Sequence, residues 1–319
     1  MIEVKNLTKR YGNHLAVDHL NFTVESGKIY GFLGPNGAGK STTMNIMTGY
    51  LGATEGQVLI DGHDILKEPE EAKKNIGYLS EIPPLYMEMT VREYLEFAAE
   101  LKGIKKDKRE PQIEEVIRLA KLRDVENRLI QNLSKGYKQR VGLAQAVLGF
   151  PEIIILDEPT VGLDPKQIIE IRELIRKLAK KHTVILSSHI LAEVREVCDY
   201  IMIISGGKLV ASDTTENLEN MMSGKGQIEV EAKASRDEMD HIIRRTGKIK
   251  EVKYRTSASG ITTAQIIAKG GEDIREELFL AFSHADVPML TLNQSKTTLE
   301  EIFLELTQGS GNRMIKEEK

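Results

Sequence analysis

The chain has 319 residues, of which 40% are hydrophobic and 29% charged, an ordinary globular composition with room for one large and one small domain. Its formal net charge of -4 gives no broad attraction to nucleic acid, so we expect no nucleic-acid partner. The single cysteine, Cys198, cannot form an internal disulfide and is typical of a reducing compartment. The apolar runs fall far short of the ~20 residues of a membrane-spanning helix, so we expect no span.

The first part of the chain alternates segments of strand and helix composition. Residues 1–11 and 20–34 are rich in β-favouring residues, and a helical pattern follows Lys40. A second helix is predicted further on, because Thr90 and Glu93 have the spacing of a capping box. The apolar stripe predicted for this helix comprises Tyr94, Leu95, Phe97, Ala98 and Leu101.

Three later segments are predicted to be buried strands of a parallel sheet. They are the short apolar runs at residues 153–156, 183–188 and 200–205. An amphipathic segment from Leu191 to Val197 separates the last two and predicts a helix. Because strands alternate with helices, the fold class expected for this region is α/β.

The pattern changes at residues 223–226, Ser-Gly-Lys-Gly, which we interpret as a linker between domains of residues 1–222 and 227–319. Beyond the linker the expected order is strand, helix, strand, strand, helix, strand. That order predicts a small α+β, ferredoxin-like domain. A last helix is predicted over residues 299–307, and this part of the sequence carries no chemical motif.

A glycine-rich stretch between a strand and a helix carries the most specific motif. Residues 34–41, GPNGAGKS, match the pattern G-x-x-x-x-G-K-[ST]. Glycines at these positions let backbone N–H groups surround phosphate oxygens at a helix N-terminus. Lys40 supplies a charge for the β- and γ-phosphates, and Ser41 supplies a hydroxyl for Mg²⁺. The motif therefore predicts a nucleoside triphosphate site.

Polar residues follow two of the predicted buried strands. Asp157 suits a role at the metal, and Glu158 suits polarising an attacking water. Adjacent acids after a strand are often only a solvated loop start, but beside a phosphate loop they predict a catalytic strand end. His189 follows another strand at the same expected sheet edge, where its imidazole can hydrogen-bond the γ-phosphate. We interpret the other six histidines, His14 among them, as structural or exposed.

Taken in order, these motifs resemble the nucleotide-binding subunit of an ATP-binding cassette (ABC) transporter. The resemblance covers residues 1 to about 215 and rests on GPNGAGKST, LSKGY, IIILDEP, GLDP and the histidine of SSH. It implies a P-loop NTPase core of ABC type, with a mixed sheet, an antiparallel β subdomain and a helical subdomain at about residues 82–150. It also implies ATP and Mg²⁺ as ligands.

The resemblance implies a role for each matched residue. The implied catalytic residues are Glu158, His189 and Lys40, and the implied metal ligands are Ser41, Glu81 and Asp157. Tyr11 is implied to stack on adenine, with Val17 beside it. The residues implied to contact nucleotide are Tyr11, Val17, Gly34, Asn36, Gly37, Ala38, Gly39, Lys40, Ser41, Thr42, Ser134, Gly136 and Asp164.

In the family, two subunits associate head to tail. Each ATP lies between the phosphate loop of one subunit and the signature sequence, here LSKGY, of the other. The resemblance thus implies that Ser134 and the backbone N–H of Gly136 face a γ-phosphate bound to a second chain. The alternative interpretation of the polar residues around Ser134 and Gly136 is a capped turn on the surface. The implied assembly is a homodimer, or a heterodimer with a related ATPase, bound to a transmembrane permease on the cytoplasmic face of the membrane.

Two positions depart from the family pattern. Glu81 stands where the family usually has a glutamine; it keeps an oxygen for the metal but loses an amide donor, which affects water positioning and turnover. Lys135 and Tyr137 replace a glycine and a glutamine of the commonest signature, LSGGQ, whereas its serine and second glycine are retained. Similar variants occur in exporter-type transporters, so the resemblance favours export.

Residues 82–89, IPPLYMEM, are an apolar segment where the family receives a cytoplasmic helix of the membrane subunit; a packed hinge is the alternative. The sequence therefore predicts an ATPase that energises a separate permease. The alternative function is a soluble ABC-type ATPase with a regulatory or binding role. A chromosome-maintenance ATPase is disfavoured, because residues 41–132 hold no sustained heptads for a coiled coil.

Overall fold

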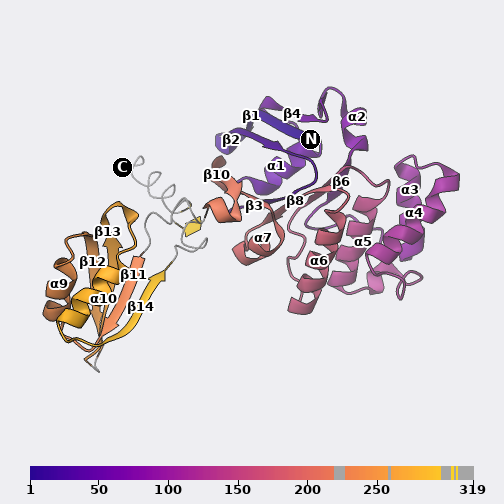
Figure 1. Ribbon diagram of the computed structural model, residues 1–319. Coiled ribbons are helices and arrows are strands. Elements are labelled where there is room, and N and C mark those ends of the chain that lie inside the picture. Colours follow the sequence, from indigo (N-terminus) through magenta and orange to yellow (C-terminus); the bar gives the residue numbers. More distant parts are fainter. Residues whose placement is uncertain (219–226, 258–259, 296–302, 305–306, 308–319) are drawn as a thin grey trace. The chain divides into compact units, whose positions relative to one another are not determined.

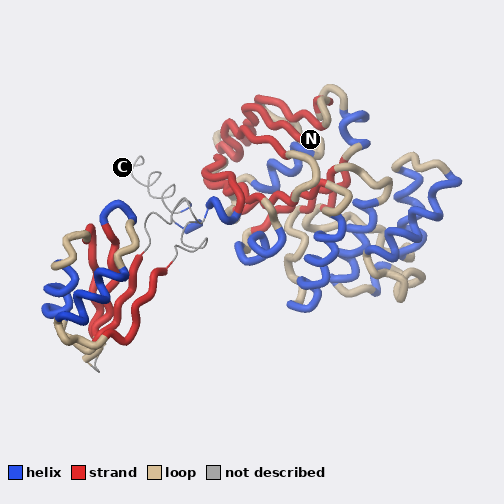
Figure 2. The backbone as a smooth tube through the Cα atoms, in the orientation of Figure 1, coloured by secondary structure: helices blue, strands red, loops and turns tan. Residues whose placement is uncertain are grey.

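A computed structural model, drawn as a ribbon in Figure 1 and as a tube in Figure 2, describes residues 1–218, 227–257, 260–295, 303, 304 and 307. One compact unit contains Met1–Thr214 and a second comprises Thr215–Glu305. The expected linker at 223–226 and most of the helix expected at 299–307 lie outside the described residues. The domain boundaries expected from the sequence therefore stay predictions.

A six-stranded sheet forms the centre of the first unit, in the order β10-β9-β3-β8-β7-β6. The five strands from β9 to β6 run parallel, and edge strand β10 runs antiparallel to β9. The strands are β3 (Ile29–Leu33), β6 (Ile76–Leu79), β7 (Ile153–Leu156), β8 (Thr183–Ser188), β9 (Tyr200–Ser205) and β10 (Lys208–Thr214). β3, β7 and β8 are buried along their whole length, as their unbroken apolar character predicts for strands covered on both faces.

The carboxyl ends of the parallel strands meet at one edge of this sheet. β3 leads into the phosphate loop, β7 is followed by Asp157, β8 by His189, and β6 ends two residues before Glu81. The parallel register pairs Leu156 with Leu186, so β8 runs two residues, Ser187 and Ser188, past the end of β7, alongside Asp157 and Glu158. Four segments that are far apart in the sequence thus place their polar residues at a common edge.

A second, antiparallel sheet has the order β2-β1-β4-β5. Its strands are β1 (Ile2–Tyr11), β2 (His14–Val24), β4 (Glu55–Ile60) and β5 (His63–Asp64). Its buried side chains form one hydrophobic core with the central sheet and with helix α1 (Lys40–Met47), through residues such as Ile2, Phe32 and Met44. The expected antiparallel β subdomain is therefore present.

Three helices form the expected helical subdomain, and they pack on one another (Figure 1). They are α3 (Val91–Leu101), α4 (Lys106–Leu119) and α5 (Lys135–Val147). The capping box of Thr90 and Glu93 starts α3 as predicted. Leu101 was predicted on the buried stripe but is largely exposed, because α3 ends at this residue. The remaining α-helices of this unit are α2 (Pro69–Lys74), α6 (Pro165–Leu178) and α7 (Leu191–Val197).

The second unit has the predicted order of strand, helix, strand, strand, helix, strand. From Gln227 onward, its described strands and α-helices are β11 (Gln227–Ala232), α9 (Arg236–Arg244), β12 (Ile249–Thr256), β13 (Thr262–Ala268), α10 (Arg275–His284) and β14 (Met289–Ser295). The strands pair antiparallel in the order β12-β13-β11-β14. Residues from both helices, such as Met239 and Phe282, share one hydrophobic core with the sheet, in a ferredoxin-like arrangement.

Within the described residues, we find no helix with the length and apolar character needed to cross a membrane.

Candidate functional site

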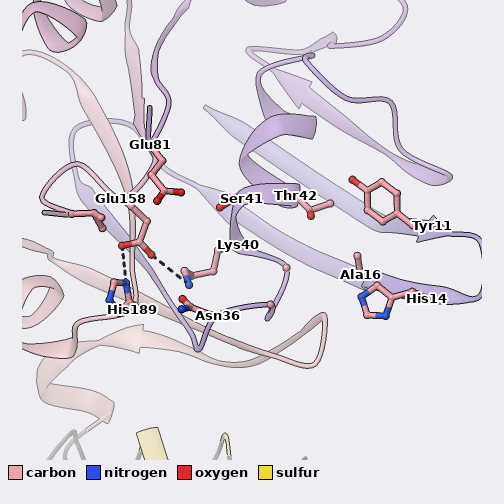
Figure 3. A pocket seen from close by; sticks show the side chains of 13 residues that line it. Tyr11, His14, Ala16, Asn36, Lys40, Ser41, Thr42, Glu81, Glu158 and His189 are labelled. Carbon is pink, nitrogen blue, oxygen red and sulfur yellow. Dashed lines mark hydrogen bonds and ion pairs between the residues drawn. The ribbon is translucent and has the colours of Figure 1, made fainter. Parts of the chain in front are cut away.

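A pocket of about 440 Å³ opens at the carboxyl edge of the central sheet. Tyr11 and His14 lie at one end of this pocket and Glu158 and His189 at the other, with Lys40 between them (Figure 3). The lining residues are Tyr11, His14, Ala16, Asn36, Gly37, Gly39, Lys40, Ser41, Thr42, Glu81, Glu158, Val161 and His189. The phosphate loop with Lys40, the other two candidate catalytic side chains and the candidate adenine contact therefore share one hollow.

The phosphate loop has a backbone that only glycine fits at several positions. Gly37 and Gly39 have φ angles of 79° and 103°, in the left-handed region. A Cβ atom at Gly39 would lie 2.5 Å from the carbonyl oxygen of Ala16, and one at Gly34 would lie 2.4 Å from a backbone oxygen of β9. Because α1 begins directly after this loop, its first backbone N–H groups are available to an anion.

The ammonium group of Lys40 is buried at the centre of the site. Its Nζ donates hydrogen bonds to the carbonyl oxygens of Gly34, at 2.8 Å, and Pro35, at 3.3 Å. The same nitrogen lies 3.5 Å from Oε1 of Glu158. A buried cation beside the helix start gives this end of the pocket a strong preference for an anionic group.

Glu158 is held from two sides and has an unusual backbone. Its Oε2 lies 3.0 Å from Nδ1 of His189. Its φ angle is 47°, a left-handed conformation that costs a non-glycine residue roughly 1–3 kcal/mol. The backbone N–H of Glu158 donates a 2.9 Å hydrogen bond to Oγ of Ser187, which helps to keep this conformation.

Asp157 does not line the pocket itself but is hydrogen-bonded to Ser41, which does. Its Oδ1 accepts hydrogen bonds from Oγ of Ser187, at 2.5 Å, and Oγ of Ser41, at 3.3 Å. Burial raises the pKa of Asp157 above its ordinary value, and these two hydroxyl hydrogen bonds oppose the shift. No three His, Cys, Asp or Glu side chains of the described ranges are grouped to hold a metal. The hard oxygens of Ser41, Asp157 and Glu81 fit Mg²⁺ that also takes oxygens from a bound phosphate.

The signature residues do not line this pocket. Ser134 is exposed and caps α5, where its Oγ accepts a 3.4 Å hydrogen bond from the backbone N–H of Tyr137. A Cβ atom at Gly136 would lie 2.5 Å from Oε1 of Gln167 in the first turn of α6. Asp164 caps α6 and accepts a 2.9 Å hydrogen bond from the backbone N–H of Gln167. The candidate residues Ser134, Gly136 and Asp164 thus lie together at two helix starts, outside the pocket of their own chain.

The structure differs from the sequence prediction at the adenine end. Tyr11 lines the pocket as expected, and the ammonium of Lys9 lies 5.3 Å from the centre of its ring. Val17, however, has 0% exposure and packs in the hydrophobic core. His14 and Ala16 line the pocket instead, because alternate side chains of strand β2 point to opposite faces. That alternation was a signal in the sequence that could have identified His14.

Sequence reasoning also missed the buried hydroxyl groups behind the site. Ser187 hydrogen-bonds both Asp157 and Glu158, and Thr160 and Ser188 are likewise buried. The sequence signal for Ser187 and Ser188 was weak: they stand immediately before His189 at the end of a buried strand.

A second hollow, of about 860 Å³, lies next to the first and shares Ser41 and Glu81 with it. Residues 82–84 of the apolar segment IPPLYMEM line it, and Ile82 is 83% exposed. Tyr50 and Tyr78 also line this hollow and supply aromatic surface. The structure thus brings the first part of the predicted partner segment to a groove.

Comparison with known proteins agrees with this geometry. A family model described as ABC transporter matches residues 17–161. The bacitracin transport ATP-binding protein BcrA of Bacillus licheniformis is 43% identical over 221 residues, which make up 69% of this chain and 71% of that protein. The chain belongs to the ABC transporter ATP-binding proteins.

Solved ABC structures have the same fold as about two thirds of this chain. An ATP-binding subunit of an ABC transporter has a TM-score of 0.64 and 31% identity, covering 70% of this chain and 93% of that one. A dimeric post-hydrolysis state of the ATP-binding cassette MJ0796, bound to ADP and Pi, has a TM-score of 0.61 and 28% identity, covering 67% of this chain and 98% of that one. The chain is therefore an ABC-type ATPase with a P-loop NTPase core, and its ligand is a nucleotide.

Proposed function

We propose that this ABC ATPase energises a separate transmembrane permease, and that it works as an exporter subunit through ATP-dependent head-to-tail dimerisation. One observation carries the proposal. Lys40, Glu158 and His189 meet in one pocket, whereas the exposed helix start at Ser134 lies outside it. A second chain can therefore complete the site by bringing its Ser134 to the phosphates.

Within one chain, the phosphate loop binds the β- and γ-phosphates through backbone N–H groups and Lys40. Ser41, Glu81 and Asp157 would hold Mg²⁺, which would supply positive charge against the phosphates. Glu158 polarises the attacking water, because its buried carboxylate lies at the phosphate end of the pocket. His189 orients Glu158 and hydrogen-bonds the γ-phosphate. Asn36 and Thr42 line the same cradle, and Tyr11 stacks on adenine.

Between chains, Ser134 and the backbone N–H of Gly136 contact the γ-phosphate of the facing protomer, and Asp164 lies beside that contact. The helix start of α5 favours an anion at this position. The dimeric cassette bound to ADP and Pi supports such pairing in a related protein. The partner is a second copy of this chain or a related ATPase, and hydrolysis removes the anionic bridge.

The permease docks in the groove of about 860 Å³ lined by Ile82, Pro83 and Pro84. An exposed apolar residue such as Ile82 fits a partner surface. Docking places the subunit on the cytoplasmic face of the membrane. Export is supported by the signature variant with Lys135 and Tyr137 and by the similarity to a protein named for bacitracin transport.

We also propose the division into an ATPase domain at 1–222, a linker at 223–226 and an accessory α+β domain at 227–319. The two compact units, with their border after Thr214, support a division in this region of the chain. The separate hydrophobic core of the second unit supports an independent accessory domain.

The substitution Glu158→Gln tests the proposed function. It removes the base but keeps size and hydrogen bonding, so ATP binding should persist while turnover falls at least 100-fold. Turnover is measured as phosphate release and binding with a fluorescent ATP analogue. The control Glu231→Gln makes the same change in the second unit and should retain full turnover. Unchanged turnover in Glu158→Gln would overturn the assigned role.

A further inference from the structure

Three consecutive residues at or just after the end of β8 are linked to the loop that follows β7. They are Ser187, Ser188 and His189. Ser187 accepts a hydrogen bond from the backbone N–H of Glu158, at 2.9 Å, and donates one to Asp157, at 2.5 Å. His189 contacts the carboxylate of Glu158 at 3.0 Å. Ser188, which lies between them, reaches the same loop indirectly, through a buried carboxylate.

That carboxylate belongs to Glu193, in helix α7. One oxygen, Oε2, accepts two hydrogen bonds: from Oγ1 of Thr160 at 2.6 Å and from Oγ of Ser188 at 3.1 Å. Glu193 is only 6% exposed, and both hydroxyl groups are buried. Glu193 therefore connects the loop after β7 to the end of β8 by two hydrogen bonds to a single atom.

A carboxylate at this position is a poor choice for stability alone. The other buried residues of α7 are Leu191, Val194 and Val197, so the inner face of the helix is otherwise apolar. Burying a charged group costs free energy that a packed apolar side chain does not cost. A residue that breaks the apolar pattern beside a catalytic loop points to a functional requirement.

Thr160 belongs to a tight turn that starts at Glu158. The backbone N–H of Val161 donates to the carbonyl of Glu158, and that of Leu163 donates to the carbonyl of Thr160, both at 3.2 Å. Holding the hydroxyl of Thr160 in place therefore fixes the turn that carries Glu158 in its left-handed conformation. The same turn leads to Asp164 at the start of α6.

We propose that Glu193 is a positioning residue for ATP hydrolysis, which acts by holding Thr160 and Ser188 so that Glu158 and His189 keep their mutual position. The inference rests on the proposed role of Glu158 in turnover. Glu193 itself touches neither nucleotide nor water in this scheme. Its loss should lower kcat through misplaced groups while leaving ATP affinity, which depends on the phosphate loop, nearly unchanged.

The first test uses Thr160, because its side chain can be changed without changing its size. Thr160→Val removes the hydroxyl donor and should lower kcat about 10- to 100-fold, with KM for ATP changed less than about twofold. Thr160→Ser keeps the hydroxyl and should restore most of the turnover. Equal kcat in the valine variant and the wild type would overturn the inference.

The second test separates positioning from stability. Glu193→Gln keeps a carbonyl oxygen that can accept both hydroxyls, so it should retain most of the turnover. The double variant Thr160→Val/Glu193→Leu removes an acceptor and one of its donors together, so its melting temperature should stay close to that of the wild type. Its kcat should nevertheless fall as far as that of Thr160→Val. A double variant that is stable and fully active would overturn the inference.

The matched control is Thr183→Val. Thr183 is a buried threonine at the start of β8, the end opposite to Ser188. Its Oγ1 accepts a 3.0 Å hydrogen bond from the backbone N–H of Gly27. This variant should lose stability but keep its kcat. A kcat in Thr183→Val as low as that of Thr160→Val would mean that any weakened β8 slows turnover, and would overturn a specific role for Glu193.

The deciding experiment is a double-mutant cycle in the Glu158→Gln background. If Glu193 acts through Glu158, adding Thr160→Val there should lower the residual single-turnover rate less than about twofold. A further loss as large as in the wild-type background would overturn the inference. Unchanged turnover in Glu158→Gln alone would instead overturn the proposed function, so the two failures are distinguishable.

Discussion

Nδ1 of His189 lies 3.0 Å from Oε2 of Glu158, so a side-chain pair joins the ends of β7 and β8 at the edge of the central sheet. The other carboxylate oxygen, Oε1, lies 3.5 Å from the buried Nζ of Lys40. Glu158 is thus held between an imidazole and an ammonium group, and its orientation depends on both. This relationship places the candidate base beside the cation that we assign to the phosphates.

We expect His189→Gln to slow hydrolysis more than it weakens ATP binding. The amide can still contact Glu158, but the imidazole that hydrogen-bonds the γ-phosphate is lost. The kcat should fall about 10- to 100-fold, with ATP affinity changed less than threefold. Phosphate release and nucleotide fluorescence measure the two quantities. His19→Gln, an exposed substitution in β2, should leave both unchanged; a kcat of His189→Gln equal to the wild type would contradict the assignment.

We expect Glu81→Gln to raise turnover at saturating Mg²⁺ while weakening metal binding. The change removes one negative charge from a site that already contains Asp157 and Glu158, and it restores an amide donor for water. The kcat should rise roughly twofold or more, and the Mg²⁺ concentration for half-maximal rate should also rise. A magnesium titration of the ATPase rate measures both. A lower kcat at saturating Mg²⁺ would show that the carboxylate itself is needed.

Asp157→Asn should stabilise the nucleotide-free protein at neutral pH. Burial raises the pKa of Asp157 above its value in the unfolded chain. The contribution of this carboxyl group to folding stability is therefore complete below the unfolded pKa, about 3.9, and is lost as the pH rises through the folded pKa. Asparagine keeps the Oδ1 acceptor without the buried charge. The melting temperature at pH 7 should rise roughly 2–4 °C.

Two further measurements belong to this prediction. The rise in melting temperature caused by Asp157→Asn should become smaller as the pH falls toward about 4, because the wild-type carboxyl group then becomes neutral. The Mg²⁺-dependent part of the stabilisation by ATP should disappear in the variant, which shows that the charge serves the metal. A melting temperature at pH 7 below that of the wild type would refute the pKa argument.

The sequence predicted best those elements whose burial is uniform. The apolar runs 153–156 and 183–188 match β7 and β8 to the residue, because strands covered on both faces need unbroken apolar side chains. β6, residues 76–79, was missed: it is an edge strand of four residues with alternating burial and gives little pattern. The order of elements in the ferredoxin-like unit was predicted because strand-like and helix-like segments alternate along residues 227–295.

The site was predictable where its chemistry is local in the sequence. The phosphate loop and the pair Asp157 and Glu158 carry their motif in a few consecutive residues. Glu193 and Thr160 could not be found in this way, since their role depends on a contact between residues 33 positions apart. The misplacement of Val17 had a different cause: the side-chain alternation of β2 was not applied to the adenine end of the pocket.

ATP-bridged pairing is tested most directly by the molar mass of the Glu158→Gln protein, measured by light scattering after size exclusion. Without nucleotide we expect one chain, 35.8 kDa, and with saturating Mg²⁺ and ATP we expect twice that mass. Adding Ser134→Arg should prevent the increase, because the larger side chain blocks the helix start that meets the phosphate. A Glu158→Gln protein that binds ATP but keeps the mass of one chain, alone and with its permease, would contradict the bridge.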